Sequence, residues 1–459
     1  MADVFTNDLR IREQEVGANS GSWGSLLNSS LENIAEAFSL GSEALSDAST
    51  ATITIADGTS DEARSFNLKL TGSLSQACTV TLAPNTVSKV WVIENNAGDT
   101  VTISQGSGAN VVIPNGGIRM IATDGAGSGA AVTDVLDMLG GTGNVGLGSG
   151  AFGTGLTTGT DNVAIGEAAG DALTSGSDNT FVGDNAGGGT TTASSNVAVG
   201  TDALLANSTG ASNVAIGHLA LDANTTASFI TAVGEKALSA NTTGAKNTAV
   251  GRAALQSTTT QSNNTALGYN ALSSGSNTGA ANTGIGQDVL SGNTTGSNNT
   301  SIGAGSMENN STGSSGTAVG KGSLAANTTG ANNTSVGYNS LVSNTTGSSA
   351  VAVGYGALAA HTTDTGNVAV GYNALTSHTT ADGGYNVAVG YAALDANTDG
   401  HSNIGIGKNA LGANTTADNN TAVGTNALLT NTTGANNVAV GSAALDGNTT
   451  ASDNIAIGL

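Results

Sequence analysis

From residue 141 onward, the hydrophobic and polar positions of the chain recur with a fixed period. The unit is N-[V/T]-A-[V/I]-G, two variable residues, A-L, two more residues, N-T-T-G, and two or three polar residues. The glycine that ends the first motif, called the anchor glycine below, occurs 19 times between Gly148 and Gly458. All but three of the intervals between anchor glycines are 17 residues. Such self-similarity predicts a parallel β-solenoid over residues 141–459.

Each unit also predicts its own local structure. The Val, Ile or Leu before the anchor glycine shares a strand face with the Val or Thr two residues earlier, and the residue between them is usually small. One strand face is therefore aliphatic and the other nearly smooth. The anchor glycine suits a corner with positive φ or close backbone approach. The A-L pair predicts a second short strand, and N-T-T-G predicts a turn.

Asn stands before the Val/Thr position in 16 of the 19 units, which predicts an internal ladder of side-chain amides. A coil of 17 residues encloses little volume. A single stack would expose its small-residue face and much of its Val stripe, so we expect several chains, most plausibly three, to share one axis. The predicted rod has a length on the order of 90 Å.

Residues 1–46 predict an arm followed by a helix. Apolar residues recur there at spacings of four, three and four, which is helical periodicity: Leu27, Leu31, Ile34 and Phe38. A single apolar stripe on one helix needs a partner, either the same helix of other subunits or a docking protein.

Residues 47–140 change to alternation with period two, in runs such as ATITIA, CTVTLA and KVWVIEN. This pattern predicts a small antiparallel β domain with Trp91 in its core. The segment TDVLDML, which ends at Leu139, predicts a short helical connector to the solenoid.

The charge balance excludes several classes of partner. The formal net charge is −22, which disfavours binding to nucleic acid and to anionic membrane surfaces. No run of 18 apolar residues predicts a membrane span, and the first residues lack the pattern of a secretory signal. Cys78 is the only cysteine, so no intrachain disulfide is expected. We therefore expect a protein made in the cytoplasm and not inserted into a membrane.

No catalytic, cofactor-binding or metal-binding set is predicted, and the chain is not expected to be an enzyme. The four histidines are His218, His361, His378 and His401. His361 and His378 are 17 residues apart and replace the Asn of N-T-T-G, so they are expected to stack as exposed turn residues. No carboxylate or cysteine is expected beside them, and a metal site is disfavoured.

The residue after the anchor glycine is an outward, variable position. It is tyrosine in four successive coils: Tyr338, Tyr355, Tyr372 and Tyr391. Stacked tyrosines predict an exposed aromatic strip of the kind on which sugars pack. The simpler interpretation is that the rings only stabilise the stack.

The units NVAIG at 213–217 and NVAVG at 437–441 resemble the head repeats of trimeric autotransporter adhesins. That resemblance covers residues 141–459 and implies a trimeric parallel β-roll. The period differs from that family, whose heads commonly use shorter coils.

Residues 9–38 resemble the virion-attachment segment of bacteriophage tail fibres. The matching pattern is Gly, Trp-Gly, Leu-Asn and Ile, at Gly17, Trp23, Gly24, Leu27, Asn28 and Ile34. The segments KVWVIENNAGDTVTI and VVIPNGGIRMIATDG also look like the domains that follow such segments.

Together these resemblances imply a homotrimeric tail fibre, located in the virion. Its N-terminus would dock to tail or baseplate proteins, and its shaft would reach a host-surface glycan or outer-membrane receptor. The alternative is a bacterial cell-surface trimeric adhesin. The repeated Thr-Thr raises a third class, an ice-binding solenoid, although the threonines are expected in a turn.

Overall fold

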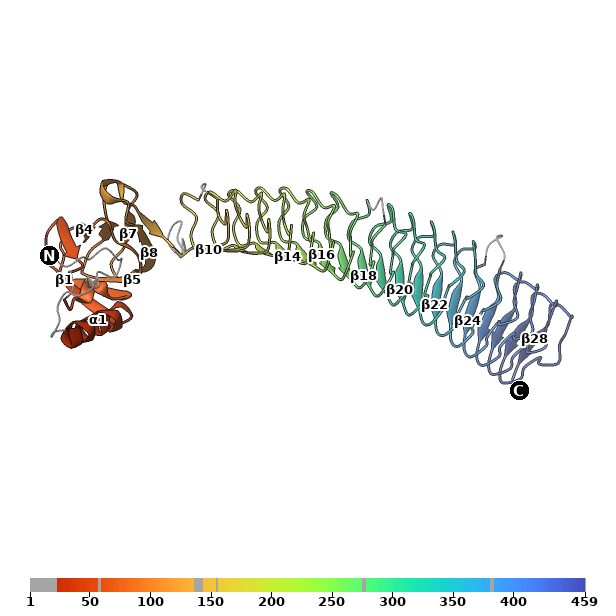
Figure 1. Ribbon diagram of the computed structural model, residues 1–459. Coiled ribbons are helices and arrows are strands. Elements are labelled where there is room, and N and C mark those ends of the chain that lie inside the picture. Colours follow the sequence, from red (N-terminus) through yellow and green to blue (C-terminus); the bar gives the residue numbers. More distant parts are fainter. Residues whose placement is uncertain are drawn as a thin grey trace. The chain divides into compact units, whose positions relative to one another are not determined.

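The computed structural model describes residues 23–56, 59–135, 143–153, 156–274, 278–379 and 384–458. The chain divides into two compact units, Met1–Met138 and Leu139–Leu459, which are described separately (Figure 1). The first unit contains an α-helix and two small sheets, and the second is a parallel β-solenoid.

The first unit begins with helix α1 (Trp23–Ala37), as the apolar periodicity predicts. One sheet has the order β1 (Leu40–Leu45), β3 (Asn67–Gly72), β5 (Ser88–Asn96), β8 (Ile118–Asp124) and β9 (Val132–Asp134). The other has the order β2 (Thr50–Thr54), β4 (Cys78–Ala83), β6 (Val101–Ser104) and β7 (Val111–Ile113). The described part of the unit also contains two 3₁₀ turns, η1 (Glu62–Arg64) and η2 (Gly127–Gly129). Trp91 is buried in the core as predicted.

These sheets are mixed, so the prediction of an antiparallel domain is wrong. Strands β1, β3 and β5 pair in parallel, as do β2, β4 and β6, because the chain alternates between the two sheets. The pairings of β6 with β7, β5 with β8 and β8 with β9 are antiparallel. Alternating polarity identifies strands but does not identify their partners.

The boundaries between the predicted segments also shift. Strand β1 belongs to the first sheet, although the sequence placed these residues with the arm and helix. Strand β9 contains Thr133 and Asp134, the first two residues of the predicted helical connector. Residues 136–139 of that connector lie outside the described residues.

The second unit is built on a 19-stranded parallel sheet with one strand per anchor glycine, which confirms the predicted solenoid. Successive strands pair residue for residue, as Val197 does with Val214. The strands are β10 (Val145–Leu147), β11 (Val163–Ile165), β12 (Thr180–Val182), β13 (Val197–Val199), β14 (Val214–Ile216), β15 (Thr231–Val233), β16 (Thr248–Val250), β17 (Thr265–Leu267), β18 (Thr283–Ile285), β19 (Thr300–Ile302), β20 (Thr317–Val319), β21 (Thr334–Val336), β22 (Val351–Val353), β23 (Val368–Val370), β24 (Val387–Val389), β25 (Ile404–Ile406), β26 (Thr421–Val423), β27 (Val438–Val440) and β28 (Ile455–Ile457).

The small-residue face of each strand points into the coil, and the aliphatic face points outward. Ala198 in β13 is fully buried, whereas Val197 and Val199 are half-buried. The interior is also filled by the Leu of each A-L pair, so only a small residue fits beneath the strand. A Cβ on Gly284 would already lie 3.1 Å from Val289 and 3.3 Å from Leu272. The expectation that a single chain exposes its small-residue face is therefore wrong.

The A-L pair forms a tight turn and not the predicted second strand. Leu204 has a φ of 56°, in the left-handed region, and its side chain is fully buried. Its backbone N–H donates to the Ala220 carbonyl of the next coil at 2.9 Å, so stacking continues without strand geometry. The anchor glycine meets both predicted conditions. Gly200 has a φ of 127°, and a Cβ there would lie 2.8 Å from the backbone of Gly217.

One large residue shows how volume is conserved along the interior. The Leu position of two coils is occupied by glycine, at Gly170 and Gly187. Phe181, which replaces the small strand residue, fills the space they leave. A Cβ on Gly187 would lie 2.5 Å from the Phe181 ring, and one on Gly170 would lie 2.7 Å from it.

Candidate functional site

Helix α1 is fixed to its own domain by the buried side chain of Arg64. The Arg64 guanidinium donates to Asn33 Oδ1 at 3.0 Å and forms an ion pair with Glu36 at 3.2 Å. It also donates to the backbone carbonyls of Thr59 at 2.8 Å and Ala56 at 2.6 Å. Charge-assisted hydrogen bonds of this kind are stronger than neutral ones, so they set which face of the helix is inward.

Glu36 is held ionised at this contact. Burial alone would raise the pKa of Glu36. Hydrogen bonds from Ser60 and from the Asp61 backbone N–H, together with the positive charge of Arg64, lower it overall. The tether is therefore an ion pair at neutral pH.

The opposite face of α1 carries the apolar residues, which the described part of the chain leaves exposed. The helix stripe consists of Leu27 (46% exposed), Leu31 (54%), Ile34 (39%) and Phe38 (80%). The inward face contains Asn33 and Ala37, which are buried. The helix thus exposes its apolar residues while polar contacts hold it to its own domain.

The residues predicted to dock to the virion are only partly placed. Leu27, Asn28 and Ile34 are exposed on α1. Trp23 and Gly24 are the first two residues of the helix, and Gly17 lies outside the described residues. The structure therefore brings together the helical half of the predicted segment.

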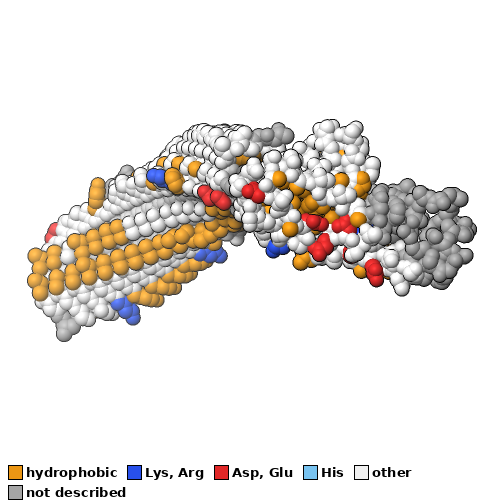
Figure 2. All heavy atoms as spheres, turned by 90° about the vertical axis from the view of Figure 1, so that its left-hand side faces the viewer, with side chains coloured by type: hydrophobic (Ala, Val, Ile, Leu, Met, Phe, Trp, Pro, Cys, Tyr) orange, Lys and Arg blue, Asp and Glu red, His pale blue; other side chains and the backbone are white. Residues whose placement is uncertain are grey.

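A second apolar surface runs along the solenoid. The residues before the anchor glycines, with the Val, Ile or Thr two positions earlier, form two columns on the outer face of the sheet, called the aliphatic columns below. Their more exposed members include Ile165 (39%), Leu267 (45%) and Ile406 (39%). Figure 2 shows rows of hydrophobic side chains along the solenoid.

The four predicted tyrosines form a continuous stack, called the tyrosine strip below. The ring centroids of Tyr338 and Tyr355 are 5.3 Å apart, those of Tyr355 and Tyr372 are 5.1 Å apart, and those of Tyr372 and Tyr391 are 5.2 Å apart. Neighbouring rings are within 11° of parallel. Each side chain remains about half exposed, between 44% and 55%. The predicted stacking is confirmed.

The stacking changes what the strip can offer a ligand. Both faces of Tyr355 and of Tyr372 are covered by neighbouring rings. A sugar therefore cannot pack flat on these two rings, which removes the mode of binding raised as an alternative from the sequence. What remains accessible is a row of ring edges and phenol hydroxyls. Ring edges carry partial positive charge, and hydroxyls both donate and accept hydrogen bonds.

Basic residues occupy the same column at both ends of the strip. Lys408 follows Tyr391 by one coil, and its Nζ lies 6.0 Å from the Tyr391 ring centroid. Lys321 precedes Tyr338 by one coil and is exposed. Nearer the N-terminus the same column carries exposed acidic residues: Glu167, Asp184 and Glu235. Glu235 is paired with Arg252, the next residue of the column, at 3.2 Å. The other two acidic residues lie toward the N-terminus, and the lysines and the tyrosine strip lie further along the solenoid.

The histidine pair differs most from expectation. His361 and His378 stack, with centroids 6.3 Å apart, but both are fully buried. The expectation of exposed turn histidines is wrong because the Asn of N-T-T-G, which they replace, points into the coil. These asparagines, called the second Asn column below, form a buried ladder such as Asn327 Nδ2 to Asn310 Oδ1 at 2.7 Å.

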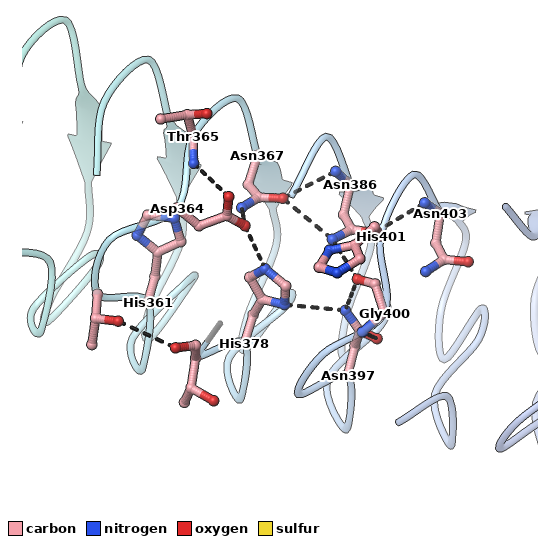
Figure 3. A network of polar contacts seen from close by, with 12 residues as sticks. His361, Asp364, Thr365, Asn367, His378, Asn386, Asn397, Gly400, His401 and Asn403 are labelled. Atoms are coloured by element: carbon pink, nitrogen blue, oxygen red, sulfur yellow. Dashed lines mark hydrogen bonds and ion pairs between the residues drawn. The ribbon is translucent and has the colours of Figure 1, made fainter. Parts of the chain in front are cut away.

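A buried carboxylate lies beside the pair, contrary to the prediction. Asp364 Oδ2 accepts from His378 Nε2 at 2.8 Å and from Asn367 Nδ2 at 3.0 Å (Figure 3). Burial alone would raise the pKa of Asp364, but hydrogen bonds from His378, Asn367 and the Thr365 N–H lower it to about 2. The signal in the sequence was that Asp364 replaces the Gly of N-T-T-G in the same coil in which His361 replaces the Asn.

The hydrogen bonds assign the tautomers of both rings. His361 Nδ1 lies 3.0 Å from Asn344 Oδ1, an acceptor, so Nδ1 carries the proton. Its Nε2 is buried and has no hydrogen-bond partner among the described residues. His378 Nδ1 accepts from Asn397 Nδ2 at 3.2 Å, so Nε2 carries the proton given to Asp364. Burial lowers the pKa of His361 to about 4.

The first Asn column, which precedes the strands, forms the predicted ladder. Asn196 Oδ1 accepts the backbone N–H of Asn213 at 2.9 Å, and Asn213 Nδ2 donates to the Ala227 carbonyl at 2.9 Å. The other histidines are less buried: His218 is exposed and His401 is half-buried. The Asn ladder therefore supplies hydrogen bonds between stacked coils.

In the described part of the chain, no group of three or more His, Cys, Asp and Glu side chains is arranged to hold a metal ion. The helices of the described residues are too short or too polar to cross a membrane. A scan against protein-family models gave no match to this chain, and a search of curated proteins found no significant similarity.

Proposed function

We propose that the chain is the shaft-forming subunit of a bacteriophage tail fibre, docked to the particle by its N-terminal segment. The observation that carries this proposal is the orientation of α1. Its polar face is tied to Arg64, and its helix stripe is uncovered. A helix held in this way presents a fixed apolar surface to other subunits or to the particle. The resemblance of residues 9–38 to virion-attachment segments supports the same assignment.

The solenoid suits the role of a rigid shaft. Each coil is hydrogen-bonded to the next through its strand, and most coils are also joined through the two Asn columns. Because no single coil buries enough surface to fold alone, the stack gains stability only as a continuous rod. Such a rod holds distal surfaces away from the particle, and weak contacts on several chains would add up to host attachment.

Two surfaces favour an assembly of several chains, and we propose three. The helix stripe exposes four apolar residues, and the residues before the anchor glycines form a row of Val, Ile and Leu side chains that are exposed or half-buried. The other column of the sheet is Thr in nine of its nineteen positions. Contiguous apolar surface of this extent is uncommon on isolated soluble chains. The small-residue face gives no further support, because it is already buried within the coil.

An ice-binding role is less well supported than a fibre. The first Thr of N-T-T-G uses its hydroxyl within the stack, as Thr225 does when it donates to the Thr242 carbonyl at 3.1 Å. A regular plane of free hydroxyls is therefore not formed by these residues. A thermal-hysteresis measurement that detected ice growth inhibition would reverse this ranking.

The proposal is tested by changing the helix stripe without removing the helix. In the variant Leu27→Asp/Leu31→Asp both exposed apolar side chains become charged, and the contacts of Arg64 are untouched. The matched control is Ser29→Asp, at an exposed position of the same helix. Mass spectrometry of purified particles should find wild type and control in the virion and the double variant absent. If the double variant is incorporated normally, or if wild type is found on cell envelopes, the fibre assignment is wrong.

A further inference from the structure

We propose that the tyrosine strip, with Lys321 and Lys408 at its ends, binds an extended acidic glycan chain that lies parallel to the solenoid axis. This inference rests on the proposed function, because it names the class of host-surface ligand that the shaft would contact. The orientation of the rings, the distribution of charge along the column and the spacing of the tyrosines all favour such a ligand.

The ring orientation selects the chemistry of the ligand. Because the inner rings are stacked within 11° of parallel, they present edges and hydroxyls instead of faces. Partially positive edges and phenol donors favour oxygen-rich, electron-rich groups. Carboxylates and ring hydroxyls of a glycan meet this requirement, whereas flat stacking of a sugar on Tyr355 or Tyr372 is blocked.

The charge distribution permits an anion here and disfavours it elsewhere. The chain carries a net charge of −22, yet the sequence between Glu308 and Asp395 contains only Asp364 and Asp382 as acidic residues. Asp364 is buried inside the coil, where its carboxylate accepts hydrogen bonds from His378 and Asn367 and is not presented at the surface. The same column is acidic at Glu167 and Asp184, where an anionic chain would be repelled. Glu235, in contrast, is paired with Arg252 of the next coil at 3.2 Å.

The lysines extend the strip at both ends. Lys321, the four tyrosines and Lys408 occupy six successive coils in one column. Each ammonium is exposed and provides a donor for a carboxylate. A ligand that follows the column would therefore meet a cation, a row of hydroxyl donors and a second cation.

The spacing favours a polymer over a small molecule. Neighbouring rings are 5.1–5.3 Å apart over the four coils, so equivalent donors recur along the axis. A repeating glycan can contact several of them at once, and each added contact raises the overall affinity by multivalency. A monosaccharide would engage one or two positions and bind weakly.

The experiment measures binding of the full chain to two probes, polysialic acid and the neutral glucan dextran, by biolayer interferometry. The variant Tyr355→Thr/Tyr372→Thr removes the centre of the strip. Threonine already occupies the same column position at Thr201 and Thr425, so the solenoid accommodates it. The matched control is Tyr269→Thr, which removes a tyrosine of the same column outside the strip.

Wild type and control should bind polysialic acid more tightly than dextran, and the double variant should bind it on the order of tenfold or more weakly. Lys321→Gln/Lys408→Gln should also weaken binding and reduce its dependence on salt. The proposal is wrong if wild type does not prefer the acidic probe. It is also wrong if the double tyrosine variant binds like wild type.

The test of glycan binding and the test of the fibre assignment can fail independently of each other. Probe binding uses the isolated chain, whereas the helix-stripe variants report incorporation into particles. A strip that fails to bind glycan leaves incorporation unchanged, and a failed fibre assignment leaves the probe result unchanged.

Discussion

His378 Nε2 donates a hydrogen bond to Asp364 Oδ2 across 2.8 Å, and both side chains are buried inside adjacent coils of the solenoid. Where the second Asn column consists of asparagines, their side-chain amides form hydrogen bonds from one coil to the next. Asn344 Nδ2, for example, donates to Asn327 Oδ1 at 2.8 Å. Here a carboxylate and two imidazoles replace three uncharged residues. These two coils therefore place titratable side chains in the interior of the solenoid.

Acid should destabilise the solenoid at His361. Its pKa is about 4 in the folded chain and near 6.5 when unfolded, so protons bind preferentially to the unfolded state between these values. The stability associated with the neutral ring is present above about pH 6.5 and is lost as the pH falls toward 4. Between pH 7 and pH 4.5 the loss is about 2 kcal/mol.

Thermal unfolding of wild type and His361→Asn at both pH values measures this effect. Asparagine is the residue found at most equivalent positions, so the variant keeps the ladder and removes the titrating group. Wild type should lose more stability on acidification than the variant. Equal losses would show that His361 is not the responsible group.

Removal of Asp364 should leave the His378 N–H without its buried acceptor. Asp364→Gly is expected to cost about 1–3 kcal/mol, the usual penalty for an unsatisfied buried polar group. Adding His378→Asn restores the common residues at both positions and should recover most of the loss. A double-mutant cycle from chemical denaturation measures the coupling. Additive effects of the two changes would contradict the hydrogen bond.

The first Asn column should control local opening of the stack. Asn213 Oδ1 accepts the backbone N–H of Ile230 at 3.0 Å, and both residues are buried. Asn213→Ala should therefore accelerate hydrogen exchange at Ile230, with a local cost of about 1–3 kcal/mol. Thr201→Ala, at an exposed position of the preceding coil, serves as the control and should leave exchange at Ile230 unchanged.

Phe181 and Gly187 should behave as a compensating pair. Phe181→Ala leaves a cavity beside Gly170 and Gly187 and is expected to cost about 3–5 kcal/mol. Gly187→Leu should recover part of this loss, because Gly187 has a φ of 62° and leucine adopts a similar conformation at Leu204, with a φ of 56°. Alone, Gly187→Leu should destabilise through a clash with the Phe181 ring. Thermal unfolding of the three variants tests the pair, and a stable single Gly187→Leu variant would contradict it.

The periodic parts of the fold were predictable because periodicity reports stacking directly. The anchor glycines, the first Asn column and the apolar stripe of α1 are all found where the repeats placed them. The orientation of the strand was not predictable in the same way. Whether Ala198 or Val199 points inward depends on the space left by Leu204, which the sequence alone does not measure.

In the candidate sites, too, the sequence predicted positions along the stack but not side-chain orientations. The stacking of Tyr355 and Tyr372 follows from their 17-residue spacing, whereas the covering of their faces depends on ring orientation. The sequence correctly predicted that His378 stacks on His361, but it wrongly placed the His378 side chain outside the coil. Its burial depends on the direction of the Asn that it replaces, and a turn sequence does not give that direction.

The central claim is that several copies of this chain share one axis through the helix stripe and the aliphatic columns. The most direct test is the mass of the full chain in solution, measured by light scattering during size-exclusion chromatography. The account predicts a particle of three chains, three times the 44.1 kDa of one chain. A mass of one chain at every concentration tested would contradict it.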